Sequence, residues 1–352
     1  MHLGRCGNET VRNVWKMKKK VTVVVPVYNS EKTLERCISS LCKQDYSELE
    51  ILLIDNNSTD NSKFICEQYS LQDSRIRVLE EKKRGASAAR NKGILEGTGD
   101  ILCFVDSDDE LMCDTAITEI ASVMNSGEMV LFDYVDFEPE RKRGRASFFW
   151  NNDSLTAINM LEQVEECDFV ELIFVAVWNK AFCFDTIRKN KLFFEEDRVY
   201  WEDFSFVLQY MTKIAKVRFI HKIFYKKWED HLTTAEKMGY DFLQMVQNGM
   251  NDIAKFLKPF KIYEKAYINL ARFISSIAVM SVVRIHHPNA KSSRIHCKEE
   301  IAQLLHNNAF REAFNYYRPR KGQSKALPFC MKRGMVNLVY VMGKHRAKKV
   351  YE

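Results

Sequence analysis

The sequence of 352 residues contains little glycine and proline, only 13 and 6 residues. Collagen-like and low-complexity chains are therefore excluded, because both depend on these residues. Hydrophobic residues make up 46% and charged residues 28% of the chain, which is the composition of a soluble globular protein. No internal repeat is present. The length predicts one large domain or two of ordinary size.

Closely paired cysteines are also lacking, although the chain has ten cysteines. They are scattered without a CxxC pair, so we expect reduced core thiols of a cytosolic protein and no zinc site. Residues 1–16 lack the apolar centre of a signal peptide, and we expect them to be a disordered upstream extension before a start at Met17. The longest late apolar stretch, Phe273 to Val283, is predicted to be too short to span a bilayer.

Positive charge is concentrated at the two ends of the chain. Residues 1–20 hold six Lys and Arg, residues 318–352 hold ten, and the body between them has 37 basic against 45 acidic residues. Basic ends on an acidic body argue against a nucleic-acid-binding protein and favour attachment to an anionic surface such as a bilayer. Solvated tails that only aid solubility explain the same pattern.

Buried strands alternate with helices over the first third of the chain. Residues 21–27, VTVVVPV, form a β-branched run without alternation, which is typical of a strand buried on both faces of a parallel sheet. Ser30 is expected to cap the helix that follows. Further strands are predicted at 49–55, 75–80 and 100–106, with helices opening at Asp60 or Asn61 and over 85–97. This alternation predicts a doubly wound α/β fold.

Carboxylates stand where two of these strands end. Asp55 ends the second strand, and the fourth runs into the sequence DSDD at 106–109. Ligands of such sheets bind beyond the carboxyl ends of the strands. Grouped carboxylates repel each other unless a cation neutralises them, and Mg²⁺ or Mn²⁺ prefers such oxygen ligands together with substrate phosphates. The alternative is an ordinary acidic turn that caps a helix at 114–125.

Two common nucleotide-binding motifs are missing. The first strand is followed by PVYNSEK, without the glycines of a dinucleotide-binding G-x-G-x-x-G. No GxxxxGK[ST] sequence occurs, so a P-loop is excluded.

Five segments together resemble a known family. They are VVVPVYNSEKTLERCISSLCKQ, EILLIDNNSTDNS, KRGASAARNKGILEGTGDILCFVDSDDEL, VWNKAF and YWEDFSF. In this order and at these separations they resemble the family 2 inverting glycosyltransferases with the GT-A fold, particularly bacterial enzymes that build capsule, O-antigen or related surface glycans. The resemblance covers about residues 18–235. It implies a mainly parallel, doubly wound sheet flanked by helices in a catalytic domain at 17–235, with a helical C-terminal region at 236–352.

The resemblance assigns donor-binding roles to residues near the strand ends. Pro26 and Tyr28 resemble the residues that frame the nucleoside. Asp55 resembles the carboxylate that accepts a hydrogen bond from the imide N–H of the base, which suits uracil; alternatively, it is a turn residue at a strand end. Arg84 and Arg90 border the expected diphosphate position. Arg90 is a charge partner for the diphosphate or, equally, for Asp109 or another acidic side chain.

The resemblance also assigns the metal and the chemistry. Asp108 corresponds to the direct metal ligand, Asp106 lies close to the ribose or the metal, and Asp109 supports the site or caps a helix. Asp203 resembles the general base that takes the proton of the acceptor hydroxyl in a single displacement, and Glu202 holds the acceptor or orients the site. Without the resemblance, Glu202 and Asp203 are ordinary acidic residues of a helical first turn.

Two other segments carry weaker expectations. VWNKAF at 177–182 is expected to pack under the acceptor site, with Trp178 in the core and not as a sugar platform. Lys226, Lys227 and His231 either close over the diphosphate or form a solvated basic strand end.

The C-terminal third is predicted to be helical, for example at 239–257 and 264–284. The tail at 325–350 combines an apolar run, Met335 to Met342, with basic flanks. A helix lying in the bilayer interface needs this combination. A helix docked on the catalytic domain with its basic face in water has the same pattern.

The resemblance therefore implies transfer of a sugar from a nucleotide diphosphate, expected to be uridine-linked, to a glycan or polyprenyl-linked acceptor at the cytoplasmic face of the membrane. We expect the transfer to invert the anomeric configuration and to use a divalent Mn²⁺ or Mg²⁺ ion. No nucleic-acid partner is expected, and the sequence leaves open whether the protein forms a homo-oligomer. A non-catalytic sugar-nucleotide or membrane-binding protein with the same fold is the alternative. A nucleotidyltransferase would be expected to have a glycine-rich basic loop after the first strand. Pocket shape sets the sugar, acceptor and linkage, so fold-level resemblance does not identify them.

Overall fold

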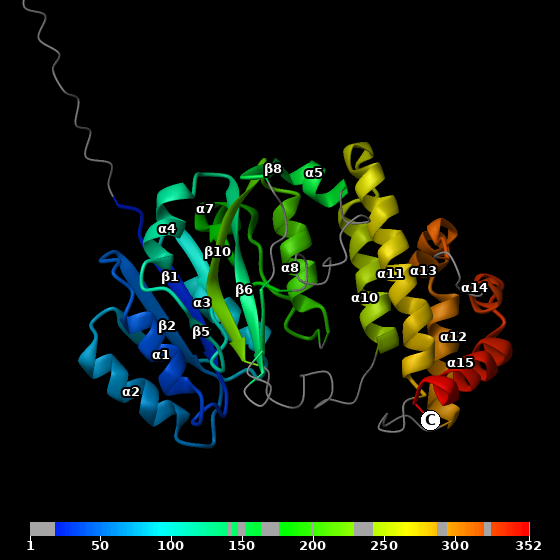
Figure 1. The fold of residues 1–352 in the computed structure, drawn as a ribbon, viewed down its shortest axis with the longest axis horizontal. Coiled ribbons are helices and arrows are strands. Elements are labelled where there is room, and N and C mark those ends of the chain that lie inside the picture. The colour runs from blue at the N-terminus through cyan, green and yellow to red at the C-terminus, as the bar shows by residue number, and fades with distance from the viewer. Residues whose placement is uncertain are drawn as a thin grey trace, which may run out of the picture.

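The computed structural model describes residues 18–138, 143–146, 152–162, 176–198, 200–228, 242–286, 294–319 and 325–351. The predicted extension at 1–16 and His231 lie outside these residues. A sheet flanked by helices forms one half of the molecule, and helices of the C-terminal third lie beside it (Figure 1).

The sheet is mixed, and the strands β1, β2, β3, β4, β6 and β10 run in one direction, as the doubly wound fold implied. Its order is β3-β2-β1-β4-β9-β6-β10-β5, with β7 added on β6 and β8 on β10. β5, β7, β8 and β9 pair antiparallel to their neighbours, and the remaining pairs are parallel. The strands are β1 Val21–Val27, β2 Leu49–Asp55, β3 Ile76–Glu80, β4 Ile101–Phe104, β5 Glu110–Leu111, β6 Glu128–Glu138, β7 Arg143–Ala146, β8 Ser154–Thr156, β9 Lys180–Cys183 and β10 Lys216–Trp228.

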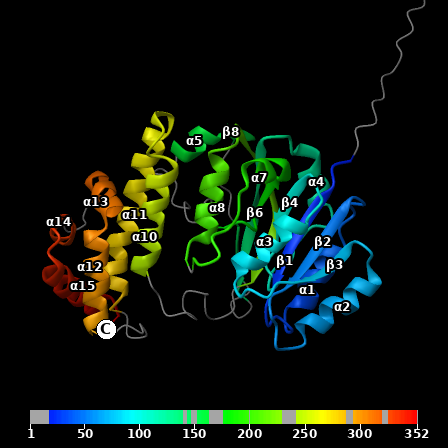
Figure 2. The same ribbon diagram turned by 180° about the vertical axis from the view of Figure 1, so that it is seen from behind.

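Helices cover both faces of this sheet (Figure 2). Val23 and Val25 of β1 pack in the core that contains α1 and α4, whereas Val24 packs in the core that contains α3, α7 and α8. The prediction of a strand buried on both faces is confirmed. The helices are α1 Leu34–Cys42, α2 Ser62–Gln72, α3 Ala86–Glu96, α4 Ala116–Val123, α5 Ala157–Glu162, α7 Phe184–Asn190, α8 Glu202–Met211, α10 Phe242–Phe256, α11 Glu264–Arg284, α12 Arg294–His306, α13 Asn308–Ala313, α14 Ala326–Lys332 and α15 Val336–Tyr351.

The prediction that Ser30 caps the first helix is wrong. α1 begins at Leu34, and its preceding residue, Thr33, makes no side-chain cap. The backbone carbonyl of Ser30 accepts from the N–H groups of Thr33 and Leu34, each at 2.9 Å. Its hydroxyl lies 2.7 Å from the hydroxyl of Ser107, so it is used to hold the acidic loop.

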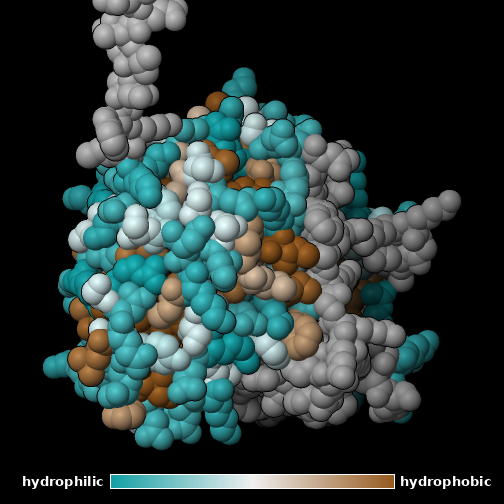
Figure 3. All heavy atoms as spheres, turned by 60° about the vertical axis from the view of Figure 1, so that its left-hand side comes forward, coloured by the Kyte–Doolittle hydropathy of each residue, from teal (hydrophilic) through white to brown (hydrophobic). Residues whose placement is uncertain are grey.

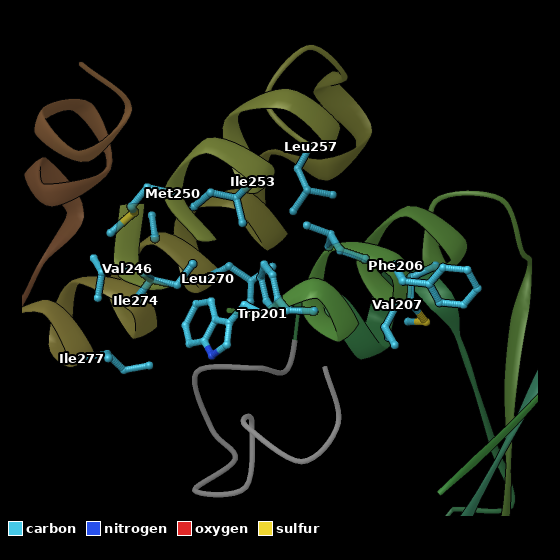
Figure 4. Close-up of a cluster of buried hydrophobic side chains, with 14 of the residues drawn as sticks. Trp201, Phe206, Val207, Val246, Met250, Ile253, Leu257, Leu270, Ile274 and Ile277 are labelled. Atoms are coloured by element: carbon cyan, nitrogen blue, oxygen red, sulfur yellow. The ribbon is translucent and has the colours of Figure 1, made fainter. Parts of the chain in front are cut away.

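The hydrophobic core continues from the sheet into the C-terminal helices. Side chains of α8 and of α10 and α11 interdigitate around Trp201 (Figure 4). The predicted catalytic domain and the predicted C-terminal region, divided near residue 236, therefore share one continuous hydrophobic core. Since α8 opens with Glu202, these helices support one wall of the candidate site.

Among the residues that the structure describes, one helix, Lys261–Arg284, is long and apolar enough to cross a membrane. The stretch Phe273 to Val283, which was predicted to be too short to span a bilayer, is only part of this 24-residue helix. However, 61% of its most apolar window is buried inside the structure. This burial is typical of a core helix.

The outer face around the N-terminal half is mostly hydrophilic, with scattered apolar patches (Figure 3). Among the described cysteines all are free, and most are buried.

The tail forms α14 and α15, and α15 packs on α11 and α12 through Val339, Tyr340 and Ala347. The tail therefore docks on the other C-terminal helices, whereas the expected alternative to membrane binding had it docked on the catalytic domain.

Candidate active site

The acidic loop follows β4 directly. The strand ends at Phe104, so Asp106 stands just beyond its carboxyl end, near the ends of the parallel strands β1 and β2. The Asp106 side chain is 29% exposed and Asp108 is exposed, whereas Asp109 is buried. α1 holds the loop from one side, because Thr33 donates to the Ser107 carbonyl at 3.1 Å and Arg36 donates to the Asp108 carbonyl.

Asp109 supports this loop from below. Its two oxygens accept hydrogen bonds from the Tyr225 hydroxyl at 2.7 Å and from the Trp228 backbone N–H at 2.8 Å. The same Tyr225 oxygen accepts from the Asp106 N–H at 3.2 Å. Asp109 does not cap the following helix, since that helix starts after Thr115. Of the two expected roles for Asp109, support of the site is therefore the one observed.

These carboxylates suit a divalent cation. Burial, followed by the charges of Asp106 and Asp108, raises the pKa of Asp109 to about 8. A bound cation would remove this repulsion. Within the described ranges no group of three or more His, Cys, Asp or Glu side chains has the arrangement of a metal site. The loop offers two accessible carboxylates, and an ion there takes further ligands from phosphate and water.

Arg90 of α3 connects the acidic loop to the start of α8. Its guanidinium donates to Asp106 Oδ1 at 3.1 Å and to Asp203 Oδ1 at 2.9 Å, and it lies 3.6 Å from Glu202 Oε1. The side chain is 7% exposed and rests over the ring of Phe194. Although burial opposes its charge, the carboxylates, led by Asp203, raise the pKa of Arg90. The expected acidic partner exists, and it is not Asp109.

Asp203 has the properties that a base at neutral pH needs. Its side chain is 14% exposed in the first turn of α8. Burial raises its pKa to about 7; Arg90 opposes this shift, and the charges of Glu202 and Asp106 add to it. A carboxyl group with this pKa accepts a proton more readily than an ordinary aspartate does. The neighbouring Glu202 is 23% exposed.

The residues predicted to bind the nucleoside lie in β1, at the end of β2 and in the loops after β1 and β3. Asp55 is buried at the end of β2, while Tyr28 is 49% exposed, with the Arg84 guanidinium 6.0 Å from its ring centroid. The side chain of Asn56 donates to the Lys83 carbonyl at 2.7 Å and accepts from the Gly85 N–H at 2.7 Å. Asn56 thus fixes the loop that carries Arg84. Pro26, within β1, is partly exposed.

Trp228 lies between two cations beside the acidic loop. The Arg36 guanidinium is 3.9 Å and the Lys226 ammonium 4.0 Å from ring centroids of its indole, and the indole N–H donates to Glu110 at 3.1 Å. Lys226 also pairs with Glu110 at 3.0 Å. Arg36, Lys43 and Lys226 line a cavity of about 320 Å³. Lys226 thus already has an acidic partner, and Lys227 lies 3.6 Å from Asp136.

Trp178 lies in the core, as predicted, and its neighbours at 177–182 are buried as well. Trp178 is 7% exposed and stacks on Tyr225 with ring centroids 4.7 Å apart. Lys180 of β9 is fully buried and donates to Asn179 Oδ1 at 2.6 Å. Burial lowers the pKa of Lys180 to about 7. Its charge is one of those that act on Asp203.

The fold and these side chains define a GT-A type of protein, with an acidic loop and a buried acid on opposite sides of one arginine. Residues 22–183, a little under half of the chain, match the model of the family Glycosyl transferase family 2. The match begins in β1 and ends with β9, and thus includes both the acidic loop and Arg90.

Individual proteins agree with this assignment. The chain is 39% identical over 126 residues to the glycosyltransferase GlyG of Streptococcus pneumoniae, covering 35% of this chain and 41% of GlyG. It is 34% identical over 119 residues to the Escherichia coli UDP-Glc:alpha-D-GlcNAc-diphosphoundecaprenol beta-1,3-glucosyltransferase WfgD, covering 34% and 46%. The chain thus spans less than half the length of either relative.

The likeness in three dimensions extends further along the chain. The structure of S. aureus TarS 1–349 in complex with UDP-GlcNAc superposes with a TM-score of 0.71 at 17% identity, covering 94% of this chain and 92% of that one. The C-terminal helices, where the sequence resemblance fades, therefore belong to the shared fold. The predicted GT-A fold is confirmed.

Proposed function

We propose that the protein transfers a sugar from a nucleotide diphosphate, a UDP-sugar, to a hydroxyl of a glycan or lipid-linked acceptor, with inversion and with a divalent cation. The observation that carries this proposal is the position of Arg90. It holds Asp106 of the acidic loop and Asp203 of α8 on the two ends of one guanidinium. A metal-bound diphosphate and a base for the incoming hydroxyl are needed on the two sides of a transferred sugar.

The roles of the other residues follow from their positions. Asp108 and Asp106 are the proposed metal ligands, because they are the accessible carboxylates of the loop. Bound there, the ion would supply positive charge for the departing diphosphate. Asp55, Tyr28 and Pro26 border the proposed nucleoside position, and Arg84 lies beside Tyr28. A buried carboxylate at the base position suits the imide N–H of uracil, and the names of WfgD and of the TarS complex contain UDP-sugars.

Metal-dependent turnover of the donor tests this function. The purified protein with Mn²⁺ is expected to hydrolyse at least one sugar from a panel of UDP-, GDP- and TDP-sugars, and Asp108→Asn should lose most of this activity. Asp114→Asn, an exposed acid a few residues further on, is the matched control and should keep it. A wild-type protein that binds UDP but turns over no donor would favour the rival, a non-catalytic sugar-nucleotide-binding protein with this fold.

The acceptor is proposed to be membrane-linked, at the cytoplasmic face. The outer side of α14 and α15 exposes four large apolar side chains, and we call this the tail surface: Phe329, Met335, Leu338 and Val341. Exposed basic residues border it, including Lys332, Arg333 and Lys344. Residues 325–351 contain no Asp or Glu at all. Apolar groups beside unopposed positive charge suit an anionic bilayer.

A further inference from the structure

The helix that carries the proposed base starts from a strained residue. Trp201, immediately before Glu202, has φ 61° and ψ 31°, in the left-handed region that bulky side chains rarely adopt. It makes no side-chain cap. Such a conformation persists only where the surrounding structure imposes it. It also sets the direction in which Asp203, two residues later, leaves the chain.

Helix α10 imposes this conformation through packing. Trp201 is 8% exposed, and its indole inserts between α8, α10 and α11 (Figure 4). Gly249 of α10 makes room for it, because a Cβ at this position would lie 2.7 Å from Trp201 Cε3 and 3.2 Å from Ile274 Cδ1. Any side chain at Gly249 would therefore push the indole, or α10, away.

Helix α10 also holds the loop before Trp201 by polar contacts. Arg198 and Asp252 form a two-pronged ion pair with N–O distances of 2.6 and 3.1 Å, and their side chains are 7% and 5% exposed. Asn248 donates to the Tyr200 carbonyl at 3.1 Å. Ser205 of α8 donates to Asp252 at 3.3 Å, so Asp252 joins the loop to the helix.

Resting on the function proposed above, we propose that α10 is the positioning element of the general base. Gly249, Asn248 and Asp252 fix Trp201 and the loop before it, and so aim the Asp203 carboxylate at the acceptor side. The proposed nucleoside and metal residues sit on the loops after β1, β2 and β4, away from these contacts. Disturbing α10 should therefore slow transfer while leaving donor binding intact.

Two variants of the full-length protein test this inference. Gly249→Ala inserts a methyl group against the indole, and Asp252→Asn removes the ion pair at nearly constant volume. Each is expected to lower kcat ~10–100-fold, because small misplacements of a catalytic group are costly. The Kd for UDP with Mn²⁺, measured by calorimetry, should stay within about twofold, since binding does not use this wall. Asn251→Ala, on the exposed side of α10, is the control and should match wild type.

A rescue variant separates positioning from general loss of structure. Trp201→Phe removes the ring atoms that the new methyl group would meet, so Gly249→Ala with Trp201→Phe should recover much of kcat. The inference is overturned if kcat is unchanged in both single variants, or if kcat and UDP affinity fall together. If Gly249→Ala does not fold, the kcat and the UDP affinity of Asp252→Asn test the inference by themselves. A wild type that turns over no donor, or turnover indifferent to Asp203→Asn, refutes the proposed function instead.

Discussion

A single guanidinium joins the two acidic halves of the candidate site. Arg90 contacts Asp106 and Asp203, which lie on separate elements, and is itself buried. An arginine in this place bridges the two carboxylates, since each gives its guanidinium a favourable partner. It does not leave Asp203 with an ordinary pKa, because burial outweighs the ion pair.

Replacing the proposed base should separate binding from chemistry. In Asp203→Asn the volume and one acceptor for Arg90 remain, but the side chain no longer takes a proton. We expect turnover to fall ~10²–10⁴-fold, while the Kd for UDP with Mn²⁺ changes little. Asp197→Asn is the control, because Asp197 is a fully exposed acid of the preceding loop. A variant that keeps most of its kcat would remove Asp203 from this role.

The rate should depend on pH through the same group. The base acts only when deprotonated, and the pKa of Asp203 is raised to about 7, so activity should fall as pH decreases through that value. A cation at Asp106 removes one of the charges that raise it, so the apparent midpoint with metal should lie at or below 7. The measurement is kcat/KM from about pH 5.5 to 8 at saturating Mg²⁺. A flat profile would contradict it.

The sequence located the acids but not their partners. Asp55 and the group at 106–109 were predictable because buried strands end there. The contact of Arg90 with Asp203 spans 113 positions, and that of Tyr225 with Asp109 spans 116. No local periodicity specifies which distant side chains meet, so Tyr225, Trp228 and Asn56 were missed as parts of the site. Of these three residues, only Asn56 could have been recognised from the sequence, because it is a polar residue beside Asp55 at the end of a predicted strand.

At the scale of elements, the first four strands were predictable and the later ones were not. β1 and β2 occupy the predicted ranges because each is a continuous apolar run. β10 runs over 13 residues without regular alternation and has register shifts around Ile223, so its pattern resembles no simple strand. β9 joins β4 and β6 in antiparallel pairs, which no strand-helix alternation predicts.

One close contact between elements gives a stability prediction. At Gly93 of α3 a Cβ would lie 2.5 Å from Val24 Cγ2 in β1. Alanine normally stabilises a helix interior by about 1 kcal/mol over glycine, but overpacking a core costs ~1–3 kcal/mol. We expect Gly93→Ala to lower the free energy of unfolding in urea, and Gly93→Ala with Val24→Ala to relieve the clash.

Leu95→Ala is the control for this experiment, because Leu95 is 69% exposed on the same helix. Its free energy of unfolding should stay close to that of wild type. If Gly93→Ala is more stable than wild type, α3 does not depend on close approach to β1.

At the scale of the whole molecule, the tail both completes the core and faces outward. Leu327, Val339 and Tyr340 are buried, while Leu338 and Val341 are 52% and 60% exposed. Removing the tail at Arg318 would therefore uncover core residues as well as remove basic charge. The two roles are better separated by substitutions on the tail surface alone.

Those substitutions predict a change in membrane binding. Leu338→Gln with Val341→Gln, and separately Lys344→Gln with Lys349→Gln, should weaken co-sedimentation with vesicles that contain phosphatidylglycerol. Each lost positive charge near the surface is worth ~1 kcal/mol. Neutral phosphatidylcholine vesicles should bind all forms weakly. Leu71→Gln, in α2, is the control, since Leu71 is 82% exposed. Equal sedimentation of all variants would refute membrane docking through this surface.

The stacking of Trp228 between Arg36 and Lys226 has an optical consequence. The indole N–H and the backbone N–H of this residue both end on the acidic segment, at Glu110 and Asp109. The fluorescence emission of Trp228 is therefore sensitive to the electric field at the acidic segment. Binding of a divalent cation to that segment would change this field. The chain thus carries an unlabelled fluorophore beside the proposed ion position, suited to following occupancy in real time.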